Sequence, residues 1–151
     1  MTRVYVGYAE FGLENVDDEF IQFIFDVAVS LSKLDAEAEI GLVITDDEHM
    51  RKLNLQYRGK DSTTNVLSFG YLETSSEGFV APGDEHYVGD IYISRPKVME
   101  EAKEMGITER DRFLQLFVHA ILHLAGMDHL TDLDAETMEA LEDVIIAKVL
   151  E

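Results

Sequence analysis

Three of the five histidines of this chain lie within eleven positions, at His119, His123 and His129. On a helix, His119 and His123 would project from the same face, one turn apart. Gly126 follows three residues after His123, and glycine readily takes the left-handed conformation that ends a helix and turns the chain back. The returning chain could then bring His129 to the same ion. The spacing H-x-x-x-H-x-x-G-x-x-H therefore predicts a metal site made of three imidazoles.

Zinc is the metal that this ligand set favours. The chain has no cysteine, so disulfides and thiolate ligands are excluded, and a metal site must use histidine and carboxylate. Three neutral imidazoles with an open fourth position are the arrangement of a catalytic zinc, and we expect one Zn²⁺ per chain. Nickel, copper or iron would also accept these ligands. A metal-bound histidine usually donates a hydrogen bond to an oxygen acceptor through its other ring nitrogen, and the nearby candidates are Asp128, Asp132 and Asp134. At least two of these three aspartates are expected only to cap the last helix or to face water.

The residue after the first histidine limits the chemistry of such a site. The same spacing occurs in metzincin peptidases, where a glutamate at this position is the general base of peptide hydrolysis. Here the position is occupied by Ala120, which cannot take up a proton. The spacing thus suggests a metallopeptidase, while Ala120 within the same motif weakens that interpretation.

A helix over residues 109–125 must position the first two histidines. Its side chains are apolar almost all round, and one polar stripe contains Arg112, Gln115, His119 and His123. A helix that is apolar on its other faces is buried, so both histidines are expected to project from a buried helix. His49 and His86 are expected on a surface helix and in a loop, outside the site.

The remaining elements predict an α+β domain. Strands are expected over the ranges 3–8, 38–45, 66–71 and 88–94. Helices are expected over 17–34, from a cap at Thr45 or Asp46 to about Tyr57, from Pro96 to about Gly106, and over 109–125 and 134–150. Strands early and helices late favour about five helices packed on a mixed four-stranded sheet. We expect residues 1–151 to form a single domain, with an exposed, mobile loop over 72–87.

Charge and hydropathy limit the partners of the protein. The net charge of −19 argues against a protein that simply coats nucleic acid, because phosphate affinity comes mostly from lysine and arginine. Residues 51–70 are an exception, with the four basic residues Arg51, Lys52, Arg58 and Lys60 and one acidic residue. No apolar run is long enough to span a membrane, and the first residues, MTRVYVGYAEFG, show no apolar signal core and no cleavage pattern, so we expect a cytoplasmic protein without a membrane partner.

Several stretches of the sequence resemble the YbeY family of bacterial metal-dependent endoribonucleases. The stretch HAILHLAGMDH is similar to the family signature H-G-x-L-H-L-x-G-Y-D-H, and it departs from that signature at Ala120 and Met127. The stretch LNLQYRGKDSTTNVLSF (53–69) is similar to a second family block, and VGDIYIS (88–94) to a third. The segment MEALEDVIIAKVL near the C-terminus resembles the closing helix of the family.

This resemblance implies an α+β domain in which His119, His123 and His129 bind one zinc ion. It implies cleavage of single-stranded RNA in the maturation of ribosomal RNA, notably at the 3′ end of the small-subunit 16S rRNA, and a role in ribosome quality control. It also implies that Arg58 is an active-site residue. The partners that it implies are single-stranded rRNA, the small ribosomal subunit and a ribosome-assembly GTPase.

The residues themselves fit such a reaction. Arg58 lies in the basic segment, and its guanidinium can bind a phosphate through two hydrogen bonds while staying charged. We expect Arg58 opposite the metal with the scissile phosphate between them, and Lys60 as a further substrate-binding residue. The attacking group can be a metal-activated water, with or without Asp128 or another acid as the base, or the 2′-hydroxyl of the RNA. The sequence does not choose among these routes.

Two other functions stay open on the residues alone. One is a metallopeptidase of metzincin type, which needs a base at a position other than 120. The other is a non-catalytic, zinc-containing factor that binds the small ribosomal subunit. A structural zinc usually has four protein ligands, whereas three histidines are evident here, which favours a catalytic site.

Overall fold

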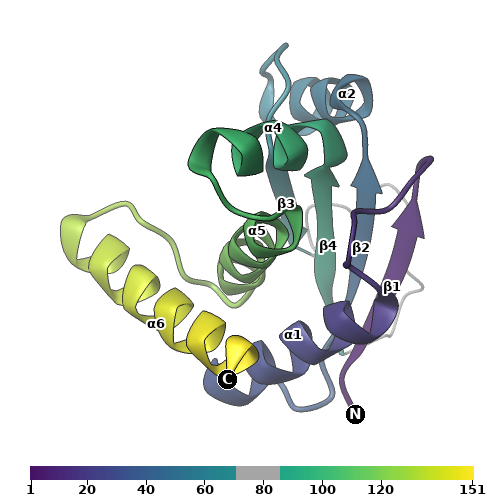
Figure 1. The fold of residues 1–151 in the computed structure, drawn as a ribbon. Helices are drawn as coiled ribbons and strands as arrows, with labels where there is room; N and C mark the ends of the chain where they lie inside the picture. Colours follow the sequence, from purple (N-terminus) through teal and green to yellow (C-terminus); the bar gives the residue numbers. More distant parts are fainter. Residues whose placement is uncertain (71–85) are drawn as a thin grey trace.

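A mixed sheet of four strands forms the framework of the molecule (Figure 1). The computed structural model describes residues 1–70 and 86–151. The strands are β1 (Arg3–Tyr8), β2 (Glu39–Thr45), β3 (Val66–Gly70) and β4 (Tyr87–Ser94), in the spatial order β1-β2-β4-β3. Strands β1, β2 and β4 run parallel to one another, and β3 pairs antiparallel with β4 at the edge of the sheet.

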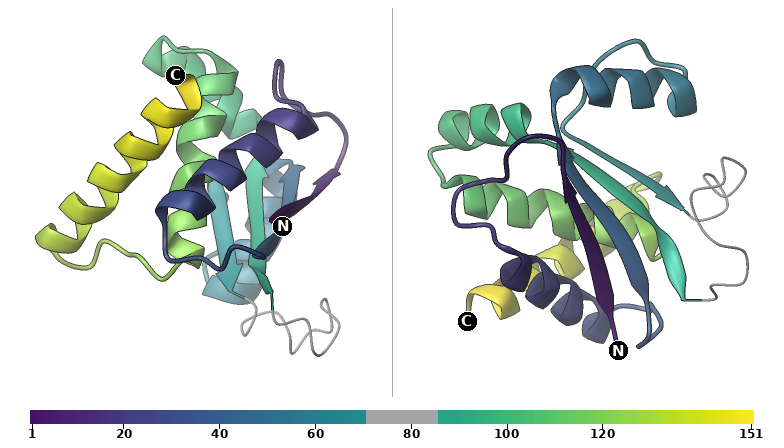
Figure 2. Two further views of the ribbon diagram at one scale, coloured as in Figure 1. Left: turned by 90° about the horizontal axis from the view of Figure 1, so that it is seen from below. Right: turned by 90° about the vertical axis from the view of Figure 1, so that its right-hand side faces the viewer.

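Five α-helices accompany the sheet in the described residues. They are α1 (Asp18–Leu31), α2 (Asp47–Arg58), α4 (Arg95–Met105), α5 (Glu109–Leu124) and α6 (Asp132–Leu150). Figure 2 shows α1, α4, α5 and α6 on one side of the sheet. The predicted α+β class with a mixed four-stranded sheet is therefore confirmed.

The predicted elements agree with the observed ones to within a few residues at each end. The largest difference is at the end of the first helix, which stops at Leu31 rather than at residue 34. Most of the loop predicted over 72–87 lies outside the described residues, and β4 already begins at Tyr87. That residues 1–151 form a single domain stays a prediction.

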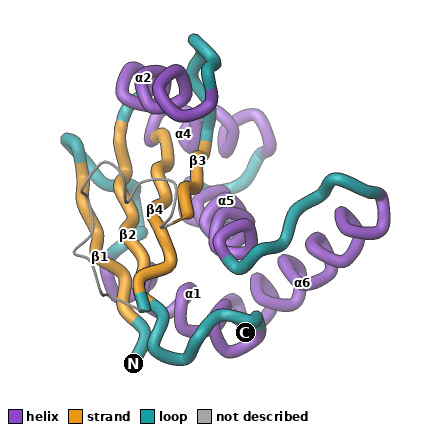
Figure 3. The backbone as a smooth tube through the Cα atoms, turned by 180° about the vertical axis from the view of Figure 1, so that it is seen from behind, coloured by secondary structure: helices purple, strands orange, loops and turns teal. Residues whose placement is uncertain are grey.

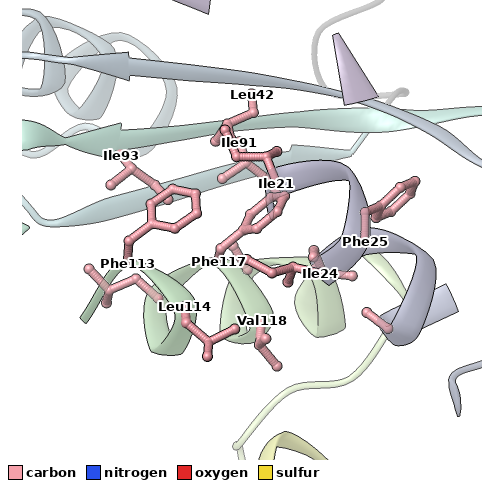
Figure 4. Close-up of a cluster of buried hydrophobic side chains, with 14 of the residues drawn as sticks. Ile21, Ile24, Phe25, Leu42, Ile91, Ile93, Phe113, Leu114, Phe117 and Val118 are labelled. Atoms are coloured by element: carbon pink, nitrogen blue, oxygen red, sulfur yellow. The ribbon is translucent and has the colours of Figure 1, made fainter. Parts of the chain in front are cut away.

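The hydrophobic core lies between the sheet and the helices on this side (Figure 4). Phe113 and Phe117 of α5 are fully buried, and so are Ile91 and Ile93 of β4 and Ile21 of α1. Fully burying one such side chain contributes about 1.5–3 kcal/mol relative to leaving it exposed. The core thus fixes α5 against the sheet. Because the helix is fixed, the orientation of its opposite face, which is turned away from the core, is fixed as well.

Helix α2 lies at the end of the sheet where β2 and β4 end (Figure 3). Tyr92 alternates along β4 with the buried isoleucines, so its side chain lies on the opposite face of the sheet. There its ring meets that of His49 of α2 edge-on, with the centroids 5.7 Å apart. The ring of Tyr57, one residue before the end of α2, packs on Phe69 at 4.8 Å. The first contact places α2 against β4, and the second places the C-terminal end of α2 beside β3.

None of the helices in the described part of the chain combines the length and the apolar composition that crossing a membrane requires.

Candidate metal centre and adjoining cleft

Helix α5 supplies the first two histidines of the predicted metal site. It begins after Thr108, whose side-chain oxygen accepts a hydrogen bond from the backbone N–H of Asp111 at 3.0 Å. Eight residues of the helix are buried: Phe113, Leu114, Leu116, Phe117, Val118, Ala120, Ile121 and Leu122. His119 and His123 are half-buried on the remaining face. The prediction that both project from a buried helix is confirmed.

The chain turns back directly after α5. Gly126 has a φ of 93°, a left-handed conformation that side chains rarely adopt. Its N–H donates to the carbonyl of His123, and the N–H of Met127 donates to the carbonyl of Leu122, both at 3.0 Å. This pair of bonds is the usual glycine-terminated helix end, as predicted from the sequence. The returning segment carries His129 toward the helix that it has just left.

The three histidines meet at one point. One ring nitrogen from each of His119, His123 and His129 lies within 4.8 Å of the other two. The centroids of the rings are 4.5 Å apart for His119 and His123, 5.3 Å for His123 and His129, and 5.8 Å for His119 and His129. The group could hold a metal ion, as the spacing in the sequence predicts.

Oxygen acceptors orient the two histidines of α5. Nδ1 of His119 lies 2.9 Å from Oε1 of Glu142 in α6, and Nδ1 of His123 lies 3.0 Å from the carbonyl oxygen of Met127. An N–H on each Nδ1 leaves the lone pair of the ring on Nε2. A carboxylate on the far side of a ligating imidazole also makes that imidazole more basic. Both rings are therefore held in the tautomer that binds a metal through Nε2.

The predicted acceptors for these two rings were wrong. The candidates were Asp128, Asp132 and Asp134. Asp128 instead accepts the backbone N–H of Leu130 at 3.2 Å, and the other two lie exposed in the first turn of α6. Glu142 was missed because it lies 23 residues from His119 in the sequence, and only the packing of α6 against α5 brings the two together. In the sequence, Glu142 was indicated solely by its place in the segment MEALEDVIIAKVL, which resembles the closing helix of the family.

The arrangement of the rings fits a cation. The Nε2 atoms of His119 and His123 are 3.0 Å apart, and two lone pairs at that distance repel unless a proton or a cation lies between them. Burial lowers the pKa of His123, and the neighbouring His119 lowers it further, which disfavours the proton. Tetrahedral zinc with bonds of 2.0–2.1 Å separates its ligand nitrogens by about 3.3 Å. The donor set therefore suits zinc.

A cleft of about 500 Å³ opens beside the histidines. Its lining includes His119 and His123 of α5 together with Arg58 and residues of the strand β3. Arg58 is the last residue of α2, and its Nη2 donates to the carbonyl oxygen of Ser68 in β3 at 2.9 Å. Its guanidinium carbon also lies 4.8 Å from the centre of the Phe69 ring, a cation–π contact. These contacts hold a positive charge in the lining of the cleft that His119 and His123 also line.

The other basic residues of the segment lie outside this cleft. Lys60 is exposed in the loop after α2 and is not among the described residues that line the cleft. Arg51 pairs with Glu48 at 2.9 Å and with Asp61, so its charge is largely matched. Of the basic residues in segment 51–70, Arg58 is thus the one that the structure brings to the histidines.

The two remaining histidines lie apart from the group of three. His49 is in α2, where its Nδ1 lies 2.8 Å from the hydroxyl of Thr45. His86 precedes β4, and its Nδ1 lies 3.6 Å from a carboxylate oxygen of Asp35. Neither shares the cleft, as expected.

The fold and the site together define a class of protein: an α+β domain with a three-histidine group, able to hold one metal ion, at an open cleft. Comparison with known proteins narrows this class. The model of the family Endoribonuclease YbeY matches residues 10–150. The chain belongs to the YbeY family, which confirms the resemblance seen in the sequence.

Individual relatives agree with this assignment. A protein from Laribacter hongkongensis named Endoribonuclease YbeY is 43% identical over 123 residues, which are 82% of this chain and 72% of the relative. A protein of the same name from Acinetobacter baylyi is 46% identical over 114 residues, which are 75% and 70% of the two chains. The solution structure of TM1509 from Thermotoga maritima matches 99% of this chain and 89% of its own with a TM-score of 0.61. At 24% identity, that last likeness shows the fold.

Proposed function

We propose that this chain, as a member of the YbeY family, is a metal-dependent endoribonuclease that acts in the maturation of ribosomal RNA. The observation that supports this best is the sharing of one cleft by Arg58 and the two histidines of α5. A phosphodiester held between a guanidinium and a metal ion has its negative charge matched from two sides.

His119, His123 and His129 would hold one Zn²⁺ through their ring nitrogens. Glu142 and the carbonyl of Met127 orient the two rings of α5, and the turn at Gly126 brings the third ring. When bound, zinc supplies a Lewis acid next to the scissile phosphate and lowers the pKa of water to about 7. The three-histidine group leaves one position open toward the substrate.

Arg58 positions the phosphate and balances charge in the transition state. Its anchor on Ser68 and Phe69 restricts the guanidinium before the RNA arrives, so less conformational entropy is lost on binding. Lys60, on the loop that follows Arg58, attracts the RNA backbone outside the cleft rather than contacting the reacting phosphate. Removing it should therefore change the salt dependence of binding more than the rate of cleavage.

Asp128 is the one carboxylate among the described residues that line the cleft. It can accept a proton from an attacking water, which would leave a 5′-phosphate or a 3′-phosphate with no cyclic product. If the 2′-hydroxyl of the RNA attacks instead, the product carries a 2′,3′-cyclic phosphate. The end groups of the products therefore distinguish the two routes.

The substrate would be single-stranded rRNA near the 3′ end of the small-subunit 16S rRNA, in the cytoplasm. The acidic surface of the chain, with its net charge of −19, repels RNA over long distances and gives little non-specific affinity. Such an enzyme depends on being placed by a partner. The small ribosomal subunit and a ribosome-assembly GTPase are the proposed partners.

The two other functions considered from the sequence are not favoured. A peptidase of metzincin type would need a base at a position other than 120, because Ala120 is buried in α5 and cannot take up a proton, and the relatives of this chain are named endoribonucleases. A purely structural zinc would be closed by a fourth protein ligand, whereas here the three-histidine group adjoins an open cleft.

The test is cleavage of a single-stranded RNA oligonucleotide by four proteins, each with its bound metal quantified. They are the wild type, His123→Ala, Arg58→Ala and the control Arg3→Ala. Arg3 is exposed on β1, at the opposite edge of the sheet from β3, so its removal changes the net charge equally without touching the cleft. A double-stranded RNA of the same sequence controls for strand specificity.

The proposal predicts that the wild type and Arg3→Ala cut the single strand alike. His123→Ala should lose both the metal and the activity. Arg58→Ala should keep the metal but lose about 100-fold or more in rate, as expected for removing a group that stabilises charge in the transition state. A metal-loaded wild type that leaves RNA intact would refute the proposal, and so would an Arg58→Ala variant with the wild-type rate.

A further inference from the structure

A second pocket, of about 440 Å³, also adjoins the metal centre, and Arg58 is not among the described residues that line it. His119 and Val66 line both this pocket and the cleft, so the two spaces meet at these residues. Leu116 and Ile146 give the pocket apolar walls, and the amide side chains of Asn65 and Gln115 add polar groups. Apolar walls with a few placed polar groups are the usual lining of a site for a small flat group.

A chain of hydrogen bonds fixes both amides. Glu101 of α4 accepts from Nδ2 of Asn65 at 3.2 Å and from two nitrogens of Arg112 at 2.8 and 2.9 Å. Arg112 in turn donates through Nη1 to Oε1 of Gln115 at 2.8 Å. Arg112 and Glu101 are mostly buried. Three segments of the chain thus combine to orient two neutral amides that line one pocket.

One polar atom of each amide remains for a ligand. Oδ1 of Asn65 is an acceptor and Nε2 of Gln115 is a donor, and neither has a hydrogen-bond partner within residues 1–70 and 86–151. The edge of every nucleobase presents donors and acceptors side by side. The pair of amides therefore matches the edge of a base in kind, with one donor and one acceptor.

The charges around the pocket disfavour a phosphate. Arg112 is paired with Glu101, so its positive charge is matched. Glu142 and Asp143 add two further carboxylates to the wall. The cleft, whose lining also includes His119, contains Arg58 in contrast. An RNA strand that passes over the histidines can place its phosphate by Arg58 and an uncharged base in the second pocket.

We propose that this pocket binds the base of a nucleotide next to the scissile phosphate, with Asn65 and Gln115 contacting its hydrogen-bonding edge. The inference rests on the proposed function, because it needs the phosphate in the cleft. A base held in this way must be unstacked and unpaired, so the pocket also explains a requirement for single-stranded RNA. Asn65 and Gln115 are then specificity-determining residues, while the reacting atoms stay with the histidines and Arg58.

The experiment varies enzyme and substrate together. Single-stranded oligonucleotides with one mapped cut receive each of the four bases, or an abasic sugar, at each of the two nucleotides that flank the cut. The wild type, Gln115→Ala and Gln115→Glu are compared, with Gln56→Ala as the control for loss of an exposed glutamine on α2. The values of kcat/KM and the metal content are measured for every pair.

The proposal expects a base preference of the wild type at one flanking nucleotide and a loss of up to about tenfold for the abasic sugar there, the effect of one neutral hydrogen bond. Gln115→Ala should be slower by a similar factor on the base-bearing RNA and equal to the wild type on the abasic one. Gln115→Glu keeps an oxygen for Arg112 but replaces the donor with an acceptor, so it should change which base is preferred. Gln56→Ala should behave like the wild type, and the metal content should be constant.

Other outcomes overturn the inference. If Gln115→Ala slows base-bearing and abasic RNA equally, or loses metal, Gln115 has only a structural role. If both Gln115 variants keep the base preference of the wild type, the pocket does not bind the base. If the wild type cuts none of the oligonucleotides, the proposed function itself fails. If the wild type cuts them and the Gln115 variants show none of the expected differences, this inference alone fails.

Discussion

The two halves of the metal centre are built differently. His119 and His123 lie on α5, which has eight buried residues and crosses the core (Figure 4). The other half, residues 125–151, carries His129 and Glu142 and has three buried residues in α6. His129 is exposed, and Leu133 of α6 is 72% exposed. Few buried contacts go with low local stability, so the second half should open more readily than the first.

The two halves of the site are therefore expected to assemble in different ways. The core places two imidazoles whether or not a metal is present, because α5 is fixed on all its apolar faces. The third imidazole depends on the turn at Gly126, and the carboxylate that orients His119 is in place only when α6 packs against α5. Metal binding should therefore order residues 125–151 more than it orders α5, and mutations in the two halves should have different consequences.

The largest expected difference is in the free energy of unfolding. Phe117→Ala in α5 removes a fully buried ring and should cost about 3–5 kcal/mol. Leu133→Ala in α6 removes an exposed side chain and should change stability by less than about 0.5 kcal/mol. Urea denaturation of the metal-free variants measures both. Similar losses in the free energy of unfolding for the two variants would contradict the inferred difference in stability between the two halves.

The next effect concerns metal affinity. Glu142→Ala removes the carboxylate that faces Nδ1 of His119 and should weaken metal binding about 10- to 100-fold. Glu136→Ala, which removes an exposed carboxylate from the same helix, is the matched control and should leave the affinity unchanged. Competition with a chelating dye measures both affinities. An equal effect of the two variants would mean that net charge, rather than the orientation of His119, is responsible.

A smaller effect is expected from the turn between the two halves. Gly126→Ala places a side chain at a φ of 93° and should cost roughly 1–2 kcal/mol. Gly106→Ala, at the end of α4 with a φ of 69°, imposes the same kind of strain away from the histidines. Both variants should lose stability in thermal unfolding, but Gly126→Ala alone should also lose metal affinity. Unchanged metal affinity in Gly126→Ala would show that His129 does not depend on this turn.

The smallest effect is a pH dependence that lies outside both halves. Burial raises the pKa of Asp90 in β4, although the Tyr87 hydroxyl donates to it and acts in the opposite sense. The folded state then holds this proton more tightly than the unfolded chain does, so the stability that Asp90 contributes is present at low pH and is lost as pH rises through the raised pKa. Thermal melts of the wild type and Asp90→Asn over a pH series test this. The stability of Asp90→Asn relative to the wild type should increase with pH, and a constant difference would contradict the assignment.

The three histidines and the turn between them could be predicted from the sequence, because local patterns encode them. The spacing of His119 and His123 predicts one helix face, and the apolar residues around them predict a buried helix. Gly126 predicts the turn, and its φ confirms it. Each of these inferences needs only neighbours within a few positions along the chain.

The contacts that orient the histidines, Gln115 and Arg58 could not be predicted in the same way. Glu142 reaches His119 through the packing of two helices, and three nearer aspartates are more obvious choices in the sequence. The polar stripe of α5 was predicted correctly, but its partner Glu101 lies on another helix, so the bonds that fix Gln115 follow only from the structure. The anchoring of Arg58 on β3 likewise depends on how α2 packs beside that strand.

The central claim is that both halves hold one metal ion and that the ion is required for cutting RNA. The most direct measurement is a titration of the metal-free protein with Zn²⁺ in which bound metal and the cleavage rate of a single-stranded RNA are measured in the same samples. We predict no cleavage without metal. The cleavage rate should rise in proportion to the bound metal and stop rising at one ion per chain. Full cleavage by the metal-free protein, or intact RNA at one bound ion per chain, would contradict it.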